Sequence, residues 1–507
     1  MITRITAPGW SGNLVALILG LSGVFSFAPF NVWLLPFIIF PLAIVLVINL
    51  APKAALFRSY CFALGFFATG LSWIHVSIHE FGNASMALAI ALTGLLVAFM
   101  ALFPALAMYV GQKLAITLRF EKTIGYFCIL IPLSLTLGEL ARSTVFTGFP
   151  WLLLGYSQFD TPLIHFASVL GVYGLSYLVY IIIGATAFML FRQKFDWLAG
   201  GLISVIMMVG IGLSQIEWVK PTGKTLSIGL VQANIPQDRK WLPEERLPTI
   251  QKYHTLTQEV SGADLVVWPE AALPVVQNSV KDYLSRLRNQ LQNMGSSLVL
   301  GIPSVEFEGD RRLFFNRALL LSETESYYNK QHLVPFGEYV PLEDWLRGLI
   351  DFFDLPMSRF SEGSHDQPNL MMGDIALAPA ICYEVAYSNL VRDIALQSGS
   401  TADILITLSN DAWFGDSVGP LQHFEIARMR AVELGRPLIR GTNTGLTGLV
   451  NFRGETTHVL PQFTADTLVG DIELVKGETP FAYWGFYINY LLLLLNIGYL
   501  LWRFRKR

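Results

Sequence analysis

A residue that could act as a nucleophile stands in the second half of this 507-residue sequence: the single cysteine of that half, Cys382. It follows the apolar run Asp374–Ala380, which predicts a short buried strand, so Cys382 stands where the chain would leave its sheet. The other two cysteines, Cys61 and Cys128, lie in long apolar segments. Cys382 is therefore a candidate nucleophile, and the cysteine by itself leaves a small buried apolar side chain open as the alternative.

A glutamate and a lysine stand at two further predicted strand ends. Glu270 directly follows the apolar run Asp264–Trp268, and the fixed φ of Pro269 would help to aim it; Lys330 follows a predicted hairpin. A thiol needs a base to become a thiolate, a tetrahedral intermediate needs a positive donor, and the leaving group needs a proton. Glu270, Lys330 and Cys382 supply these functions without a histidine, a metal ion or a cofactor. A solvated loop acid and a surface lysine are the alternative interpretations of the first two.

The region around these residues alternates predicted strands and helices, which is typical of an α/β layered domain with its chemistry at the strand ends. Strands are expected at Leu226–Ala233, Asp264–Trp268, Ser297–Gly301, Ala318–Leu321, Ser326–Tyr328, Asp374–Ala380, Asp403–Thr407, Pro437–Gly441 and Thr447–Asn451. Helices are expected at Pro243–Val260, Val280–Gly295, Tyr387–Gln397 and Leu421–Glu433.

The composition indicates that this domain is only part of the chain. With 53% hydrophobic, 14% charged and 13% aromatic residues, the sequence is too apolar for an ordinary soluble enzyme and too long for one domain. Apolar segments long enough to cross the roughly 30 Å hydrocarbon core as helices are Leu14–Phe30, Trp33–Leu50, Tyr60–Ile78, Ser85–Val110, Thr123–Leu140, Pro162–Phe191, Trp197–Ile216 and Phe481–Trp502. We therefore expect a multi-pass α-helical membrane domain of eight transmembrane helices, seven before the polar region and one after it.

The distribution of lysine and arginine between these segments predicts the orientation of the chain. The loops of one side and both termini carry Arg4, Lys53, Arg58, Lys113, Arg119, Lys122, Arg192, Lys194, Arg503, Arg505, Lys506 and Arg507. The opposite short loops carry only Arg142, which would meet a lipid phosphate or act as an interfacial anchor. Both termini are then cytoplasmic, and the polar region lies on the far side of the membrane.

Three parts of the chain follow from this pattern. We expect a membrane domain at residues 1–219, a catalytic domain at 220–478, and an eighth transmembrane helix with a basic tail at 479–507.

The net charge of −3 argues against a nucleic-acid partner, because no basic face large enough to neutralise phosphates is evident.

The polar region resembles the nitrilase, or carbon-nitrogen hydrolase, superfamily. The motifs that carry this resemblance are Trp268-Pro269-Glu270, Lys330 with His332 and Leu333, Cys382-Tyr383-Glu384, and Arg430-Ala431-Val432-Glu433. The resemblance implies an αββα sandwich in which Glu270 is the base, Lys330 stabilises the oxyanion and Cys382 is the nucleophile.

The same resemblance implies further residues around the triad. Glu338 matches a second glutamate that would orient Lys330 or relay the proton, the backbone N–H of Tyr383 would donate to the oxyanion, and Glu384 would support the site. Positions that resemble the substrate-binding surround of the family are Trp241, Asn316, Asn410 and Trp413. A lid role and ordinary packing both remain open for Trp413, and Glu433 is expected to be a structural ion-pair partner.

With its helices before and after the polar region, the whole chain resembles the apolipoprotein N-acyltransferases, inner-membrane enzymes that complete bacterial lipoproteins. This resemblance implies a ping-pong reaction with no cofactor. A phospholipid, expected to be phosphatidylethanolamine, acylates Cys382, and the α-amino group of a diacylglyceryl-cysteine at the N-terminus of an apolipoprotein then takes the acyl chain. It also implies that the catalytic domain is periplasmic.

Two other functions and one further hypothesis accompany this interpretation. A membrane-anchored amidase would use the same triad with water as the acceptor. A transporter with a periplasmic binding domain would need ionisable residues within its helices, where Glu139 is the main candidate. The segment Trp345–Phe353 has one apolar face at helical spacing, which would dip into the membrane to admit lipid or pack on the domain.

Overall fold

The computed structural model of the chain describes residues 6–82, 84–340, 359–397, 399 and 401–505, and the segment Trp345–Phe353 lies outside them. The chain divides into two compact units. The first comprises Met1–His75, Met86–Glu217 and Tyr483–Arg507, and the second comprises Val76–Ser85 and Trp218–Ala482.

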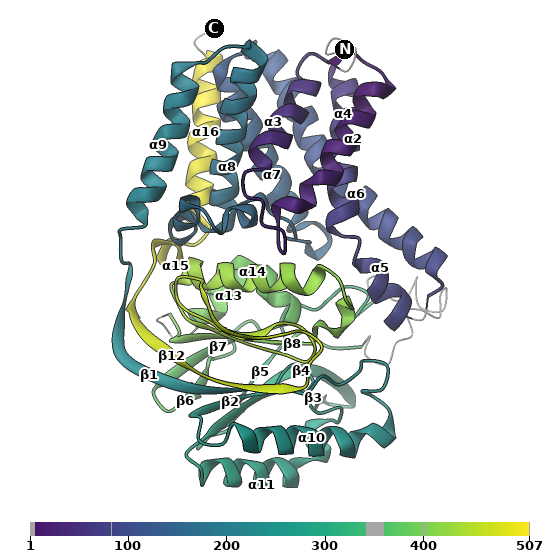
Figure 1. Cartoon of the computed structure of the whole chain (residues 1–507), viewed down its shortest axis with the longest axis vertical. Helices are drawn as coiled ribbons and strands as arrows, with labels where there is room; N and C mark the ends of the chain where they lie inside the picture. The colour runs from purple at the N-terminus through teal and green to yellow at the C-terminus, as the bar shows by residue number, and fades with distance from the viewer. Residues whose placement is uncertain (1–5, 83, 341–358, 398, 400, 506–507) are drawn as a thin grey trace. The chain divides into compact units, whose positions relative to one another are not determined.

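The first unit is helical (Figure 1). Its main helices are α2 (Trp10–Leu21), α3 (Pro36–Val47), α4 (Pro52–Gly70), α6 (Met86–Thr117), α7 (Ile131–Arg142), α8 (Ala167–Arg192), α9 (Trp197–Leu213) and α16 (Tyr487–Arg505). Two helical stretches, Met86–Thr117 and Pro162–Arg192, are long and apolar enough to cross a membrane by themselves. Four shorter apolar helices occupy Trp10–Ser26, Pro36–Val47, Trp197–Leu213 and Tyr487–Trp502.

The third apolar segment, Tyr60–Ile78, differs from the continuous helix that the sequence predicts. Helix α4 ends at Gly70, and the following helical stretch Ile74–Phe81 is bent from it by 58°. If this bent pair forms one span, up to three helices of the described chain reach membrane-crossing length. The residues beyond the bend, Val76–Ser85, belong to the second unit.

Arg142, at the end of α7, is buried, whereas the sequence indicated a residue at the lipid interface. Its Nη1 donates to the carbonyl oxygens of Phe149 (2.7 Å) and Trp151 (2.5 Å). One turn earlier, Glu139 accepts hydrogen bonds from Leu154 N and Tyr180 Oη, both at 2.9 Å. These ionisable side chains therefore hold the loop that follows α7, which is a structural use of buried charge.

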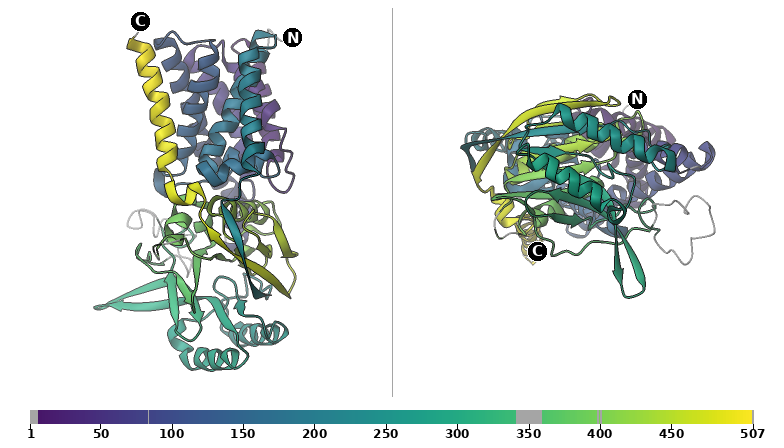
Figure 2. Two further views of the ribbon diagram at one scale, coloured as in Figure 1. Left: turned by 90° about the vertical axis from the view of Figure 1, so that its left-hand side faces the viewer. Right: turned by 90° about the horizontal axis from the view of Figure 1, so that it is seen from below.

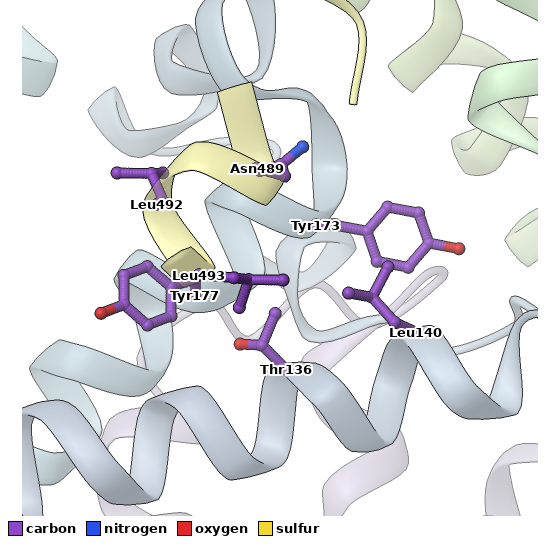
Figure 3. Close-up of a pocket in the computed structure, with 7 residues that line it drawn as sticks. All are labelled: Thr136, Leu140, Tyr173, Tyr177, Asn489, Leu492 and Leu493. Carbon is purple, nitrogen blue, oxygen red and sulfur yellow. The ribbon is translucent and has the colours of Figure 1, made fainter. Parts of the chain in front are cut away.

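Helix α16 packs against α7 and α8 (Figure 3). Asn489 donates to Leu170 O (2.9 Å), and Tyr177 donates to the side-chain oxygen of Asn496 (3.0 Å). The pocket among these helices has a volume of about 10 Å³. That volume is about enough for one water molecule and far too small for an acyl chain.

The second unit contains two six-stranded sheets. The first has the order β12-β1-β2-β3-β4-β5 and the second has the order β11-β10-β9-β8-β7-β6. The strands of the first sheet are β1 (Val219–Gln232), β2 (Leu265–Val267), β3 (Ser297–Glu308), β4 (Arg311–Leu321), β5 (Ser326–Asn329) and β12 (Asp466–Gly477). Those of the second are β6 (Leu370–Met372), β7 (Ile375–Ile381), β8 (Ile404–Ser409), β9 (Leu438–Thr442), β10 (Thr447–Val450) and β11 (Thr456–Leu460).

Helices cover the outer faces of these sheets, so the unit has four layers, as the sequence resemblance implied (Figure 1). Helices α10 (Arg246–Glu259) and α11 (Lys281–Gln292) pack on the first sheet, and α13 (Ser388–Ala395) and α14 (Gly419–Leu434) pack on the second. The outer ends of β3 and β4 extend as a hairpin beyond the body of the unit (Figure 2). Strands β6, β11 and β12 have no counterpart among the predicted strands.

Candidate active site

The predicted catalytic residues follow the ends of strands in both sheets. Glu270 comes three residues after β2, and Lys330 directly follows β5 in the same sheet. Cys382 directly follows β7 in the other sheet. Because the two sheets face each other, the ends of these strands bring the carboxylate, the ammonium and the thiol of distant sequence segments into one electrostatic cluster.

Glu270 is positioned by the end of its own strand and by a hydrogen bond from the opposite sheet. Trp268, fully buried, packs on Tyr253 with ring centroids 4.8 Å apart, and its Nε1 donates to Thr257 Oγ1 (2.9 Å), so α10 fixes the strand end. Glu270 Oε2 accepts from the backbone N–H of Asn410 (2.8 Å). Burial raises the pKa of Glu270, and Glu338 adds to that rise against the lowering effect of Lys330. The carboxylate is thus more basic than an exposed glutamate.

Lys330 lies among carboxylates and is almost fully buried. Its Nζ is 2.8 Å from Glu338 Oε2 and 3.9 Å from Glu270 Oε1. Asn316 Nδ2 joins the two acids, because it donates to Glu270 Oε1 (2.7 Å) and to Glu338 Oε1 (2.9 Å). Burial opposes the charge on Lys330, but Glu338 and then Glu270 raise its pKa above the ordinary value. Lys330 is therefore a fixed cation.

Glu338 is held in turn by the loop that carries it. Its Oε2 accepts from Val334 N (2.8 Å) as well as facing Lys330. These contacts hold the carboxylate of Glu338 beside the ammonium group of Lys330. The resemblance implied that Glu338 would orient Lys330 or relay the proton.

Cys382 has a half-buried side chain and a left-handed backbone, with φ of 52°. For a residue with a Cβ this conformation costs on the order of 1–2 kcal/mol, which the surrounding structure must supply. Burial raises the pKa of the thiol, Glu270 and Asp411 raise it further, and Lys330 and Ser409 lower it. Burial and the two carboxylates therefore favour the neutral thiol over the thiolate in the free protein.

Glu384 ties the cysteine turn to the lysine loop. Its Oε1 accepts from Tyr328 Oη (2.8 Å), Gln331 N (2.7 Å) and His332 N (3.0 Å), and its Oε2 accepts from Ile381 N (2.7 Å). Burial raises the pKa of Glu384 to about 7, against the effects of Lys330 and these backbone donors. All four contacts are with protein groups, so Glu384 fixes the distance between the two loops.

Two predicted substrate-binding residues use their polar groups within the protein. Asn316 joins the two acids, and Asn410 N holds Glu270. The side chain of Asn410 donates to Gln237 Oε1 (2.7 Å) and accepts from Asn443 Nδ2 (3.2 Å). The structure thus brings both residues to Glu270 as positioning groups, and contact with substrate stays a prediction for them.

The two predicted tryptophans differ in their surroundings. Trp413 is half-buried, its ring lies edge-on to Phe81 at 5.6 Å, and its carbonyl oxygen accepts from Ser77 Oγ (2.6 Å). Trp241 is half-buried and follows Lys240; its indole Nε1 is buried without a hydrogen-bond partner among the described residues. Tyr383, which is buried in the cysteine turn, packs edge-on to Tyr387 with ring centroids 5.1 Å apart.

Several buried charged residues near the triad escaped the sequence analysis. Lys240 is fully buried and donates to Glu270 O (3.3 Å), and burial lowers its pKa to about 8. Behind Cys382, Asp411 pairs with Arg440 (2.8 Å) and lies 3.0 Å from His423 Nδ1. Arg440 sits within the predicted apolar strand Pro437–Gly441, and a charge in a buried strand requires a partner, which is the signal that could have drawn attention to this cluster.

Glu433 has the structural role that the sequence indicated. Its Oε2 lies 2.8 Å from Arg430 Nε and accepts from Ser388 Oγ (2.9 Å), and the side chains of the ion pair are fully buried. Among the described residues, no group of three or more His, Cys, Asp and Glu side chains has the arrangement of a metal site.

Comparisons with known proteins match both parts of the chain. Residues 19–185 match the model of the apolipoprotein N-acyltransferase N-terminal domain, and residues 227–479 match the carbon-nitrogen hydrolase model. Among solved structures, a CN-hydrolase superfamily protein from Xanthomonas campestris is 16% identical, with a TM-score of 0.37, and the match covers 49% of this chain and 91% of that chain.

Two curated relatives match nearly the whole length. The apolipoprotein N-acyltransferase of Vibrio parahaemolyticus is 39% identical over 504 residues, which cover 97% of each chain. That of Shewanella oneidensis is 42% identical over 491 residues, which cover 92% of this chain and 91% of the relative. With this identity over almost all of its length, the chain belongs to the apolipoprotein N-acyltransferase family.

Proposed function

We propose that this membrane-bound acyltransferase moves a fatty acyl chain from a phospholipid, through a thioester on Cys382, to the α-amino group of the diacylglyceryl-cysteine that begins an apolipoprotein. Family membership supports lipoprotein N-acylation, and the observation that carries the proposed chemistry is the buried cluster of Glu270, Lys330 and Glu338 around the thiol. Phosphatidylethanolamine is the proposed donor.

In the first half-reaction, Glu270 takes the proton of Cys382 and the sulfur attacks the ester carbonyl of the phospholipid. The negative charge that develops on the carbonyl oxygen is stabilised by Lys330 and by the backbone N–H of Tyr383. Collapse of the intermediate breaks the ester C–O bond, Glu270 returns the proton to the glycerol oxygen, and lysophospholipid leaves.

In the second half-reaction, the α-amino group of the acceptor attacks the thioester. Glu270 takes a proton from the attacking nitrogen, the C–S bond breaks, and the proton returns to Cys382. The products are an amide at the N-terminus of the lipoprotein and the free enzyme. Neither half-reaction needs a metal ion or a cofactor.

The membrane arrangement is part of the same proposal. Residues 1–219 and 479–507 would form eight spans, made of the two long helices, the bent pair, the four shorter helices and the stretch Tyr126–Arg142. Residues 220–478 would then be the catalytic domain on the periplasmic side of a bacterial inner membrane, with both termini cytoplasmic. Both lipid substrates would reach the enzyme by diffusion in the plane of the bilayer.

Intact-mass measurement after incubation with phosphatidylethanolamine alone tests the proposed intermediate. The expected result is one fatty-acyl increment that neutral hydroxylamine removes and that the Cys382→Ser variant does not acquire. A chain that gains no increment while it releases lysophospholipid would contradict the thioester. Steady release of free fatty acid without an amine acceptor would point instead to an amidase-like hydrolysis.

A further inference from the structure

A second polar cluster lies behind Cys382 and takes no part in the proton transfers just described. It contains Ser409 at the end of β8, Asp411 in the turn Asp411–Phe414, His423 in α14 and Arg440 in β9. The exposed fraction of each residue is at most 1%. Arg440 Nη2 donates to Asp411 Oδ2 (2.8 Å), and Ser409 Oγ donates to Asp411 Oδ1 (2.6 Å). Burying such a pair is costly, so the cluster calls for a functional explanation.

Ser409 of this cluster interacts with the thiol of Cys382, and His423 contacts the backbone of the same residue. His423 Nε2 lies 3.1 Å from the carbonyl oxygen of Cys382, and a carbonyl can only accept, so Nε2 carries a hydrogen. Arg440 Nη2 and Asp411 Oδ1 each lie 3.0 Å from His423 Nδ1. In the neutral imidazole Nδ1 accepts from Arg440, and in the imidazolium it donates to Asp411. The bond to Cys382 is the same in both protonation states.

That bond fixes the orientation of a whole peptide group. The carbonyl of Cys382 and the N–H of Tyr383 belong to one planar trans unit, so they point in opposite directions. His423 holds the oxygen toward α14, and the N–H of Tyr383 must therefore point the other way. Cys382 itself has a left-handed φ of 52°, so the residue that carries this carbonyl is in an unfavourable backbone conformation.

We propose that His423, held by Asp411 and Arg440, is a positioning residue that fixes the peptide between Cys382 and Tyr383 and thereby aims the backbone N–H at the oxyanion of acyl transfer. This inference rests on the proposed function, because only acyl transfer develops negative charge on that oxygen. In this proposal His423 acts through the backbone of the nucleophile, by its bond to the carbonyl oxygen of Cys382.

Two substitutions that introduce a side-chain amide distinguish the roles of the two ring nitrogens of His423. In His423→Gln the side-chain amide nitrogen can reach the position of Nε2 and donate to Cys382 O. In His423→Asn the amide nitrogen reaches only the position of Nδ1, so the contact with Asp411 persists and the contact with Cys382 is lost. The measured quantity is the rate of acyl-thioester formation from phosphatidylethanolamine, followed by intact mass in detergent.

We expect the Asn variant to form the thioester roughly 10- to 100-fold more slowly than the native chain, and the Gln variant to recover most of that rate. Alkylation of Cys382 by iodoacetamide is the second readout, because displacement at a saturated carbon develops no oxyanion. It should stay within about threefold of the native rate in both variants. A purely structural role would slow both reactions together and lower Tm.

The outcomes distinguish this inference from the proposed function. If the native chain forms no thioester, the proposed function fails. If the native chain forms it and the Asn and Gln variants react equally fast, or if acylation and alkylation fall in parallel, the positioning role of His423 is wrong. Should the Asn variant fail to fold, His423→Met, which fills the space without a donor, takes its place against His423→Gln.

Discussion

Glu384 illustrates how a single side chain stabilises the turn at Cys382. Four donors, from Tyr328, Gln331, His332 and Ile381, point at its two oxygens. Glu384→Gln would place an NH₂ group against at least one of them, so we expect a loss of about 2–4 kcal/mol in unfolding free energy. Thermal unfolding in detergent should show a lower Tm, whereas Glu308→Gln in the exposed hairpin should leave Tm unchanged. Equal Tm values would mean that the contacts of Glu384 contribute little.

The charges around Cys382 predict opposite pH shifts for two variants. Lys330 lowers the pKa of the thiol, so Lys330→Met should raise that pKa and move the pH profile of iodoacetamide alkylation to higher pH, with an at least roughly tenfold slower reaction at pH 8. Glu270 raises the pKa of the thiol, so Glu270→Gln should move the profile to lower pH although acyl transfer is lost. The exposed Lys281→Met is the control. Shifts of the same sign in both variants would refute this electrostatic account.

The residues that we propose to react could be named from the sequence, whereas those that hold them in place could not. Cys382, Glu270 and Lys330 stand at strand ends, and that position is visible as an apolar run followed by a polar residue. The partners of these residues come from distant segments of the chain. Asn410, whose N–H donates to Glu270, lies 140 residues away from it in the sequence, and His423, which contacts Cys382 O, lies 41 residues from Cys382. Such pairings depend on how two sheets face each other, which no local pattern encodes.

At the scale of elements, the turn after β8 is shaped by a glycine and by a segment from the first half of the chain. Gly415 has φ of 56° and ψ of −159°, a region that residues with a Cβ rarely adopt, and an added Cβ would come within 2.6 Å of Val76 Cγ1. Gly415→Ala should therefore displace the turn that carries Asn410 and Trp413 and slow thioester formation, at a cost of about 1–3 kcal/mol.

The matched control for this change is Gly309→Ala. Gly309 also has a positive φ, 60°, but nothing lies within 4 Å of the added Cβ. Gly309→Ala adds a Cβ to a backbone with positive φ but creates no steric contact. We expect it to lower Tm slightly and to leave the rate of thioester formation at the native value. If the two alanine variants slow thioester formation equally, contact with Val76 does not position the turn.

Periodicity predicted the elements of the second unit well where a strand is fully buried and less well where it is not. Strands β2, β7 and β8 are continuous apolar runs, and the structure has them within a few residues of the expected bounds. Strand β12 alternates exposed and buried residues over part of its length, and β11 is mostly exposed, so both were missed. The bend after Gly70 was missed because apolar residues continue through it, and hydropathy does not register a change of direction.

At the scale of the whole molecule, the pairing of β1 with β12 brings together the two ends of the long segment that forms most of the second unit. The two strands are antiparallel, from Val219 opposite Gly477 to Gln232 opposite Asp466. The segment Trp218–Ala482 therefore begins and ends near the same end of one strand pair.

The proposed membrane topology predicts which positions an impermeant reagent can reach. Asp310, exposed in the turn between β3 and β4, should lie in the periplasm, and Lys122, exposed after α6, should lie in the cytoplasm. In a Cys382→Ser background, an Asp310→Cys variant should react with a charged maleimide in intact spheroplasts. A Lys122→Cys variant should react only after the membrane is broken, because the bilayer excludes the charged reagent. Labelling of position 122 in intact spheroplasts would reverse the orientation and place Cys382 away from the periplasm.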